Sequence, residues 1–568
     1  MSDKGGWWEG GRIGRCELRL GGYAAAVETR LARWQREGFG ERLWRKDHTL
    51  WSPEPVPELT DRMGWLELPE SAPRDLDRLM RFAEGVKSEG YRHAIVLGMG
   101  GSSLAPEVFA RSLGSAPGYP SLEVLDSTHP AAVRALAERL DLARSLFLVS
   151  SKSGTTTETL SFLRYFWDLT GRALSKDDIG QHFVAITDPG TPLERLARER
   201  RFREVFNGPE EVGGRYSAFT AFGMVPAALM GASVRVLIDR VRDMAAASAG
   251  DVPPAENPGL RLGATLGELA LAGRDKVTFL TSPTLASFPD WLEQLIAEST
   301  GKIGRGIVPV AGETAGGPEV YGPDRLFVGL LLGEDGELEA RLTDLEEAGH
   351  PVARIRCDAG VDLGGEMFRW EFAVAAAGSV LGVNPFDQPD VQLAKELAGK
   401  AMKEQSAGAR PAEDDSPRTS DPESLGRALS GWLEGSAAGE YLGLHAYLPP
   451  RPETSRLLHR LQGALRDRTR LATTFGYGPR FLHSTGQLHK GGPGECRFLQ
   501  LVDEPVEEVP VPEADYSFRT LIRAQADGDR EALEQRGRRV LRLQLGQDGA
   551  AGLEALLAAV GAPGGPQG

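Results

Sequence analysis

The chain has 568 residues, of which 41% are hydrophobic and 26% are charged, and its formal net charge is −15. This composition is typical of a globular protein, and the length is enough for about two to four domains. The negative charge, without a basic patch, argues against nucleic-acid binding. The three cysteines lie far apart, so neither a metal-binding cysteine pair nor a disulfide framework is expected. Because no apolar run could cross a bilayer and the first residues lack a signal-peptide core, we expect a cytoplasmic protein without a membrane partner.

Helices are expected from residue 20 to residue 85, and from about residue 90 strands alternate with helices. Short apolar runs predict strands within residues 93–100, 121–128, 144–151 and 181–187. The intervening stretches 130–140 and 159–169 have helical patterns. Strands that alternate with helices in this way predict a parallel sheet with both faces covered.

The same alternation occurs a second time. Strands are predicted within residues 275–282, 306–311, 325–333 and 351–357, with helices over 288–302 and 390–402. The repeat concerns architecture rather than sequence, and it predicts a second parallel sheet.

The segment 403–424 is polar, contains prolines and lacks periodicity, so it predicts a flexible linker. Beyond it, strands are expected within residues 440–449, 480–489, 497–503 and 539–546, with helices between them. The predicted fold class is therefore α/β. The expected order is a helical segment (1–85), two parallel-sheet domains (86–245 and 255–402), the linker, and a C-terminal α+β domain (425–560).

Two loops at the ends of predicted strands have residues suited to holding a phosphate group, because ligands of doubly wound sheets bind beyond the carboxyl ends of the strands. The loop GMGGSS at 98–103 combines turn-forming glycines with two serines at the start of a helix. The loop SSKSGTTTET at 150–159 has more hydroxyls than a single helix cap needs. The glycine spacing does not fit a dinucleotide fingerprint, and Lys152 is not in a Walker loop. These loops together predict a phosphate cup of neutral donors.

Five motifs in order resemble those of phosphoglucose isomerases: GMGGSSLAP, SKSGTTTET, GGRYS, AESTGK and NPFDQPDVQLAKELA, over residues 98–398. The chain is most similar to the isomerase half of bacterial transaldolase–isomerase fusions, which leaves open that it works beside a separate transaldolase. The resemblance implies two sugar-isomerase domains and a small-molecule sugar phosphate as the partner. The implied reaction interconverts glucose 6-phosphate and fructose 6-phosphate through an enediol, without a cofactor or a metal.

The resemblance also implies roles for individual residues. The implied phosphate- and substrate-binding residues are Gly101, Ser102, Ser151, Lys152, Ser153, Thr156, Thr159, Gln294 and Gln388. Glu298 matches the base that moves a proton between C1 and C2. Arg215 matches a cation that stabilises the enediolate oxygen, and Lys395 matches a lysine that assists ring opening. Each of these three residues alone would be read as an ordinary surface residue, and it is their shared order that favours a catalytic role.

The histidine for ring opening departs from the family pattern. In familiar members it lies between the glutamate and lysine motifs, often as HSxGQ, but here the only histidine between Glu298 and Lys395 is His350, in EEAGHPVARI. The matching text, LHSTGQLHKGG, occurs at 482–492, so His483 is the predicted residue. His489 and Lys490 follow closely and are candidates for contacts to the phosphate or the hydroxyls. A third domain beyond a flexible linker predicts closure over the site within one chain, which leaves a monomer or a homodimer open.

Two alternative functions stay open at this point. An isomerase of wider scope would also accept mannose 6-phosphate, because the same enediol serves both sugars. A non-catalytic sugar-phosphate sensor would keep the hydroxyl-rich loops but lose the base, and the presence of Glu298, Arg215 and Lys395 argues against it.

Overall fold

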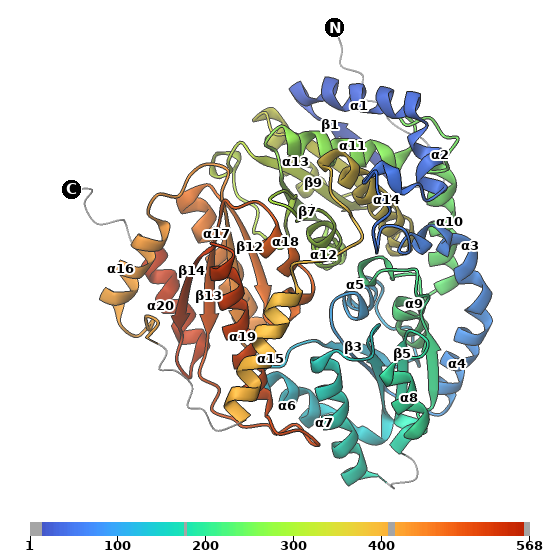
Figure 1. Ribbon diagram of the computed structural model, residues 1–568, viewed down its shortest axis with the longest axis vertical. Helices are drawn as coiled ribbons and strands as arrows, with labels where there is room; N and C mark the ends of the chain where they lie inside the picture. The colour runs from blue at the N-terminus through green and yellow to red at the C-terminus, as the bar shows by residue number, and fades with distance from the viewer. Residues whose placement is uncertain (1–13, 175–178, 407–414, 562–568) are drawn as a thin grey trace.

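The computed structural model describes residues 14–174, 179–406 and 415–561. Figure 1 shows three sheets, each flanked by helices, around a central region that contains α12 (Phe288–Thr300) and α15 (Gln392–Ser406). The three sheets are called the first, second and third sheet in chain order. The structure therefore confirms the α/β fold class that the sequence predicts.

The first sheet has the strand order β3-β2-β4-β5-β6, and every pair is parallel. Its strands are β2 (His93–Gly98), β3 (Ser121–Leu125), β4 (Ser145–Ser150), β5 (Phe183–Thr187) and β6 (Glu204–Asn207). Along β2, Ala94 and Val96 belong to one apolar cluster, whereas Ile95 and Leu97 belong to another. Because both faces of the strand are buried, its sequence is continuously apolar. The short β6 was not expected.

Helices cover both faces of the first sheet. One face packs on α4 (Leu76–Ser88), α5 (Leu104–Leu113) and α9 (Ala221–Leu229), and the other on α6 (Pro130–Arg139), α7 (Thr157–Ala173) and α8 (Pro192–Glu199). The carboxyl ends of β2 and β4 lead into the two hydroxyl-rich loops, which places both loops at the same edge of the sheet.

The second sheet has the order β1-β10-β9-β7-β8. Its strands are β1 (Arg15–Arg19), β7 (Lys276–Thr281), β8 (Val308–Val310), β9 (Arg325–Leu332) and β10 (Val352–Cys357). Only β1 is antiparallel, against the edge of β10. This strand corrects the expectation of a helical segment before residue 86. Its five residues, RCELR, include three charged side chains and only a short alternation of polar and apolar residues, which is too weak a pattern to indicate an edge strand.

The helices around the second sheet come from both sides of it in sequence. They are α1 (Ala24–Glu37), α2 (Phe39–Trp44), α3 (Leu68–Ser71), α10 (Val234–Ala247), α11 (Pro258–Leu271), α12, α13 (Gly336–Glu347) and α14 (Leu363–Leu381). Buried residues on nearly every side of α14 pack it between α10, α11 and α12. Helix α12 also contacts α5 of the first sheet and α18 (Gly486–Gly491) of the C-terminal region, so it lies where the three sheets meet.

The third sheet has the order β12-β11-β13-β14 and is parallel throughout. Its strands are β11 (Tyr441–Tyr447), β12 (Ala472–Tyr477), β13 (Cys496–Val502) and β14 (Arg539–Gln544). One face packs on α16 (Pro422–Leu433), α17 (Pro452–Thr469) and α20 (Gly549–Gly561), and the other on α18 and α19 (Phe518–Gln535). The expectation of an α+β domain here is therefore corrected to α/β.

The expected strand over residues 480–489 is wrong. That segment forms a short 3₁₀ helix, Arg480–His483, followed by α18. The segment follows Pro479 and contains Gly486, and both residue types interrupt strands. The strand that pairs with β11 is instead β12, which was not expected.

Helices also occupy both ends of the predicted linker, residues 403–424. Helix α15 extends to Ser406 and α16 begins at Pro422, whereas residues 407–414 lie outside the described residues. The domain boundaries expected from the sequence stay a prediction.

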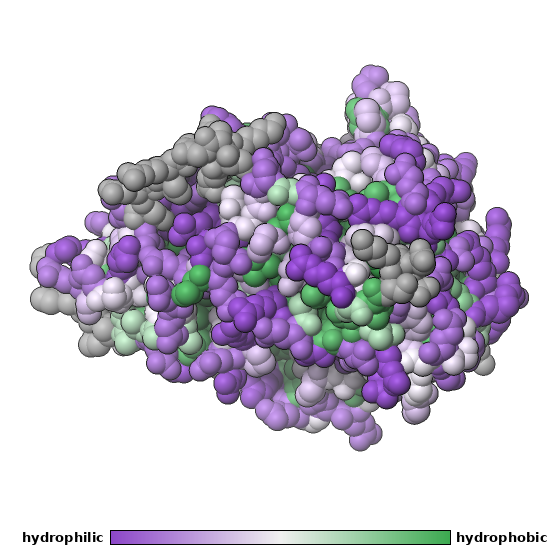
Figure 2. All heavy atoms as spheres, turned by 90° about the horizontal axis from the view of Figure 1, so that it is seen from below, coloured by the Kyte–Doolittle hydropathy of each residue, from purple (hydrophilic) through white to green (hydrophobic). Residues whose placement is uncertain are grey.

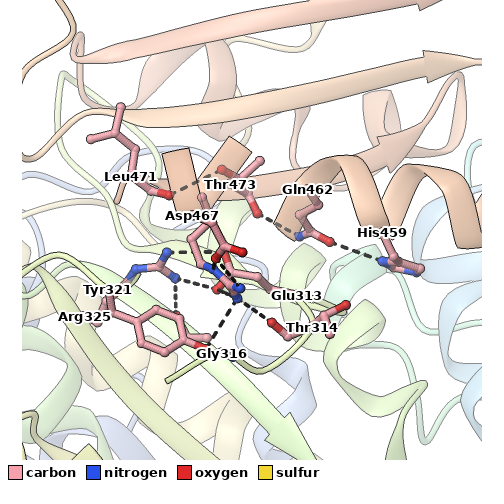
Figure 3. A network of polar contacts seen from close by, with 12 residues as sticks. Glu313, Thr314, Gly316, Tyr321, Arg325, His459, Gln462, Asp467, Leu471 and Thr473 are labelled. Carbon is pink, nitrogen blue, oxygen red and sulfur yellow. Dashed lines mark hydrogen bonds and ion pairs between the residues drawn. The ribbon is translucent and has the colours of Figure 1, made fainter. Parts of the chain in front are cut away.

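A buried polar network joins the third sheet to the second (Figure 3). Glu313, in the loop after β8, binds the guanidinium of Arg325 through two contacts of 3.2 Å, and neither side chain is exposed. Arg466 of α17 lies 3.7 Å from the same carboxylate. Gln462 of α17 donates to the carbonyls of Ala311 and Thr473. This network fixes α17 of the C-terminal region against the loop that follows β8.

Hydrophilic side chains dominate the face of the molecule drawn in Figure 2, and hydrophobic ones occur there in small groups. Large exposed hydrophobic side chains among the described residues are Met80, Val236, Leu271, Ile303 and Val506, which lie in different elements or loops. Single exposed apolar residues of this kind are normal on a protein surface.

Candidate active site

The glycine loop after β2 contacts two other parts of the chain. Gly100 has φ +56°, and a Cβ atom there would lie 2.6 Å from the backbone oxygen of His483 and 2.9 Å from Gln294 Nε2. A Cβ atom on Gly101 would lie 2.1 Å from the backbone oxygen of Gly214. Only glycine allows both approaches. The glycines therefore bring the Arg215 segment, α12 and the His483 segment together at the end of β2.

The two serines after these glycines have different environments. Ser103 Oγ donates to the carbonyl of Gly100 at 3.1 Å, so this hydroxyl closes the turn. Ser102 is buried, and its hydroxyl forms no hydrogen bond with another described residue. The two loops adjoin at Gly98, where an added Cβ atom would lie 3.0 Å from the Ser150 oxygen and 3.1 Å from Ser102 Cβ.

Hydroxyls of the loop after β4 pair with one another and with its backbone. Ser151 Oγ lies 2.9 Å from Thr156 Oγ1 and accepts from the N–H of Gly154 at 3.1 Å. Ser153 Oγ lies 2.9 Å from Thr155 Oγ1. Thr159 is fully buried, and its hydroxyl has no hydrogen-bond partner among the described residues. A buried hydroxyl without a partner is rare, which is consistent with a loop built to hold a polar ligand.

Glu298 on α12 is a buried carboxylate paired with Arg215. The guanidinium Nη1 lies 3.3 Å from Glu298 Oε2, and both side chains are at least 95% buried. Arg215 also donates to Ser299 Oγ at 2.9 Å and to the carbonyls of Pro385 and Asp387. Burial raises the pKa of Glu298 above its ordinary value, although Arg215 and Gln294 lower it in part. Such a carboxylate is suited to act as a general base near neutral pH.

Gln294 links the carboxylate of Glu298 to the C-terminal region. It lies one helical turn before Glu298, and its Nε2 is 3.4 Å from Glu298 Oε2. The same Nε2 donates to the backbone carbonyl of His483 at 2.9 Å. The predicted base and the predicted ring-opening histidine are therefore joined by one amide, although they are 185 residues apart in the numbering, 298 against 483.

The side chain of His483 contacts a carboxylate of the first sheet. Its Nε2 lies 3.0 Å from Oε1 of Glu158, a buried residue in the first turn of α7. Gln525 of α19 donates to the same oxygen at 2.7 Å. Burial alone would raise the pKa of Glu158, but the contact with His483 outweighs it and holds the pKa below its ordinary value. The carboxylate thus fixes the orientation of the imidazole.

The segment that carries His483 is fixed by ion pairs on its other side. Arg480 Nη1 lies 3.0 Å from Asp126 Oδ2, and its Nη2 contacts Glu107. Gln487 donates to Asp390 Oδ2 at 2.7 Å and to the carbonyl of Gly301 at 3.0 Å. These contacts attach the segment to the first-sheet part through Asp126 and Glu107, to the end of α12 through Gly301, and to the chain before α15 through Asp390.

A cavity of about 260 Å³ lies between the Ser/Thr loop, α15 and the C-terminal region. Predicted residues that line it are Ser153, Thr156, Lys395 and His483. Glu158, Gln525 and Lys490 also line it. Lys395 is exposed on α15, and its charge lowers the pKa of both Glu158 and Glu298 in part. Arg215, Gln294 and Glu298 are buried behind the His483 wall, joined to it by the contacts given above.

Some predicted residues lie apart from this cavity. Lys152 pairs with Asp188 and lines a different cavity with Asp61 and Arg62. Gln388 is exposed beside Asp387. His350 packs against Phe327 and lies 3.4 Å from Arg274, far from the residues of the site. His489 is buried against His445. Of the three histidine and lysine candidates in LHSTGQLHKGG, His483 and Lys490 line the cavity and His489 does not.

The sequence interpretation missed Glu158 and Gln525. Glu158 stands inside the motif SKSGTTTET, but the interpretation of that motif used only its hydroxyl residues and gave the carboxylate no role, although it contacts a histidine 325 residues away. A signal was present, because a carboxylate directly after a run of hydroxyl residues at the end of a strand is well placed for a ligand site. Gln525 had no such signal, since α19 carries no recognisable motif.

Comparison with known proteins agrees with this geometry. A family model described as "Phosphoglucose isomerase" matches residues 75–321. A "Probable glucose-6-phosphate isomerase" of Haloquadratum walsbyi is 31% identical over 343 residues, which cover 54% of this chain and 78% of the relative. The chain belongs to the phosphoglucose isomerase family. A further member, the "Glucose-6-phosphate isomerase" of Rubrobacter xylanophilus, is 29% identical over 61% of this chain and 90% of its own length.

Two solved structures share the fold with this phosphoglucose isomerase family member. A hypothetical protein from Thermus thermophilus is 26% identical, with a TM-score of 0.59, over 68% of this chain and 99% of its own. A glucose-6-phosphate isomerase from Chlamydia trachomatis has a TM-score of 0.53 and 20% identity, over 64% of this chain and 78% of its own. The second likeness concerns the fold alone.

Two searches of the described residues gave negative results. None of the helices within residues 14–174, 179–406 and 415–561 combines the length and the apolar composition that spanning a bilayer requires. In the same part of the chain, no group of three or more His, Cys, Asp or Glu side chains is arranged to hold a metal ion.

Proposed function

We propose that this family member is a glucose-6-phosphate isomerase, which interconverts glucose 6-phosphate and fructose 6-phosphate in glycolysis and gluconeogenesis. One observation carries the proposal. A buried carboxylate with a raised pKa, Glu298, is held by Arg215 and by Gln294, and Gln294 also binds the segment of His483. Aldose–ketose isomerisation needs these groups together: a base for carbon-bound protons, a cation for the enediolate and an acid for ring opening.

The substrate phosphate is assigned to the hydroxyl-rich loops after β2 and β4. Ser153 and Thr156 line the cavity, and Ser102 and Thr159 have hydroxyls without partners among the described residues. Neutral hydroxyl and N–H donors at the start of α7 suit a phosphate, because a helix N-terminus favours negative charge. Lys152 is not assigned to this group, since its ammonium is paired with Asp188.

Ring opening is assigned to His483 and Lys395, which line the same cavity. Together they supply a proton to the ring oxygen O5 and take up the proton of the C1 hydroxyl, so the C1–O5 bond breaks without a net change of charge. Glu158 keeps the His483 imidazole oriented for this transfer through its 3.0 Å contact.

Proton transfer between the carbons is assigned to Glu298. The carboxylate removes the C2 proton, a C1=C2 double bond forms, and the electron pair of the C1 carbonyl moves onto O1. Arg215 stabilises the resulting enediolate. Glu298 then returns the proton to C1, while the O2 proton is lost and O1 is protonated, which gives the ketose.

A single chain supplies every group named in this scheme, so the proposed active form is the monomer. The supporting contacts run from His483 to Glu158 and to Gln294 of the same chain. We also propose a cytoplasmic location, which fits three buried cysteines that are all free.

The test is turnover of fructose 6-phosphate, measured as formation of glucose 6-phosphate through a coupled dehydrogenase, with E298Q as the inactive control. We expect turnover in both directions for the unaltered protein and its loss in E298Q. Binding of the sugar phosphate without turnover in the unaltered protein would instead identify a sensor. Light scattering at assay dilution checks the monomer, and activity that disappears when the protein is diluted to monomer would contradict it.

A further inference from the structure

A second cluster of buried charged and titratable side chains lies behind the cavity wall that carries His483. Lys490, on α18, donates from Nζ to Asp529 Oδ1 at 2.6 Å, and the two side chains are at most 1% exposed. His445 of β11 has its Nδ1 3.3 Å from Asp529 Oδ2 and its Nε2 3.0 Å from His489 Nδ1. Nothing in the scheme above uses these four residues.

The charges of this cluster follow from its burial. Burial lowers the pKa of His445 and, more strongly, that of His489, so both imidazoles are neutral near pH 7. Burial alone would raise the pKa of Asp529, but Lys490 and His445 outweigh it and hold the pKa below its usual range. Lys490 is thus the cation that balances the Asp529 carboxylate. Its ammonium is held in place by a fixed negative charge rather than being free to move.

The ammonium of Lys490 has donors to spare. A lysine side chain carries three N–H donors, and Asp529 is its one hydrogen-bond acceptor among the described residues. The residue also lines the 260 Å³ cavity, together with His483, Glu158 and Gln525. A buried cation in a cavity wall with unused donors can donate hydrogen bonds to ligand oxygens without further desolvation.

We propose that Lys490 is a substrate-binding residue for the hydroxyl-bearing end of the sugar, and that Asp529 is the residue that positions it. This proposal rests on the proposed function. Lys490 follows His483 by seven residues and lines the same cavity as Ser153 and Thr156 of the loop assigned to the phosphate. Because Asp529 cancels its charge, its remaining donors suit neutral hydroxyl or ring oxygens better than a phosphate dianion. It differs in this from Lys395, which is exposed on α15.

The experiment compares K490M with a matched control, K276Q. Methionine keeps the unbranched stem and adapts to the surrounding packing, but it has no donor. Lys276 is also a buried lysine held by carboxylates, Asp275 at 2.8 Å and Asp324 at 3.7 Å, and it does not line the cavity. The measurements are KM and kcat for fructose 6-phosphate and the competitive inhibition constant of inorganic phosphate.

For K490M we expect KM to rise about tenfold, as for loss of a hydrogen bond to a charged group. The inhibition constant of inorganic phosphate should stay within about twofold, because that ion needs only the phosphate cup. K276Q should leave all three constants unchanged, even if it lowers the melting temperature. A purely structural role for Lys490 would move the inhibition constant and the melting temperature together with KM.

An unchanged KM in a folded, active K490M protein would overturn this proposal while leaving the isomerase assignment intact. If the unaltered protein shows no turnover, the isomerase assignment itself fails. Should K490M not fold, D529N decides, because it keeps the lysine but removes its anchor. There we expect KM to rise several-fold with little change in phosphate inhibition, and an unchanged KM would contradict the positioning role.

Discussion

The third sheet contacts its two neighbours in different ways. Against the second sheet it forms the buried network of Glu313, Arg325 and Arg466, whose charged side chains pair with one another and do not line the 260 Å³ cavity (Figure 3). Against the first sheet it places His483 on Glu158 and Gln525 on Thr128, and the first of these contacts forms part of the cavity wall.

The two kinds of contact have different consequences for the protein. A buried ion network gives a fixed geometry, and breaking it costs stability because a charge is left without a partner. A histidine–carboxylate contact at a cavity wall can instead tune a proton transfer. The network with the second sheet thus serves attachment, whereas the contacts with the first sheet include both attachment, through Arg480, and the candidate reactive group, His483. The predictions below alter one interface at a time.

The largest effect is expected for H483Q, which removes the acid for ring opening. We expect kcat to fall about a thousandfold, in the range found for loss of a general acid. Inhibition by inorganic phosphate should be retained, because the hydroxyl loops are untouched. The check is steady-state kinetics with thermal unfolding of the same sample, and near-normal kcat would rule out His483 as the ring-opening group.

The second prediction concerns the other interface. E313A leaves the fully buried Arg325 without its carboxylate and should lower the free energy of unfolding by about 3 kcal/mol or more. At a temperature where the variant is folded, its KM and kcat should match those of the unaltered protein. The control is E337Q, which breaks an exposed pair with Arg341 and should cost less than about 1 kcal/mol. Denaturant unfolding measures both, and a large change in kcat without a change in stability would reverse the roles of the two interfaces.

A smaller effect is expected for E158Q, which keeps His483 but removes the carboxylate that orients it. Loss of a charged hydrogen bond should lower kcat about ten- to a hundredfold, with little loss of stability. The matched control is D503N, which alters another histidine–carboxylate contact between the same two parts, His129 to Asp503 at 3.1 Å, outside the cavity. If E158Q and D503N lower kcat equally, the effect is one of packing rather than of the imidazole.

The smallest effect is a shift in pH dependence. Burial raises the pKa of Glu298, and the base must be ionised to accept a proton, so kcat/KM should fall as the pH drops through that raised pKa. The acid limb of the profile should therefore lie above the ordinary glutamate value of about 4.3. A profile of kcat/KM against pH measures it, and a limb at or below that value would remove Glu298 from the role of base.

Much of the fold could be predicted because strands buried on both faces of a parallel sheet have continuously apolar sequences. The runs at 93–98, 145–150 and 325–332 are all strands of the sheets. The elements that were missed lack such runs. Strand β1 is a polar edge strand, and β12 (ATTFGY) contains two threonines and a glycine. The segment 480–489 contains the apolar residues Phe481, Leu482 and Leu488, but it forms a short 3₁₀ helix and the start of α18, held by contacts with Asp126 and Glu158.

The candidate site was predictable only where a motif carries it. The glycines at 100 and 101 suggested a close approach, but which segments approach them is a matter of tertiary structure. Lys152 stands in the phosphate motif, yet its ammonium pairs with Asp188, a partner that no local pattern could reveal. Glu158 and Gln525 line the cavity because distant helices meet there, and their spacing in sequence carries no sign of it.

The account depends most on the claim that one chain completes its own active site. The direct test is to co-express E298Q and H483Q, each with its own tag, and to assay material purified through both tags and through each tag alone. If Glu298 and His483 of the same chain form the site, every combination contains only damaged sites and no activity returns. If His483 were supplied by a partner chain, the mixed dimers purified through both tags would contain one intact site of two and show about half of normal activity. That recovery would contradict the contacts from His483 to Glu158 and Gln294 on which the account is built.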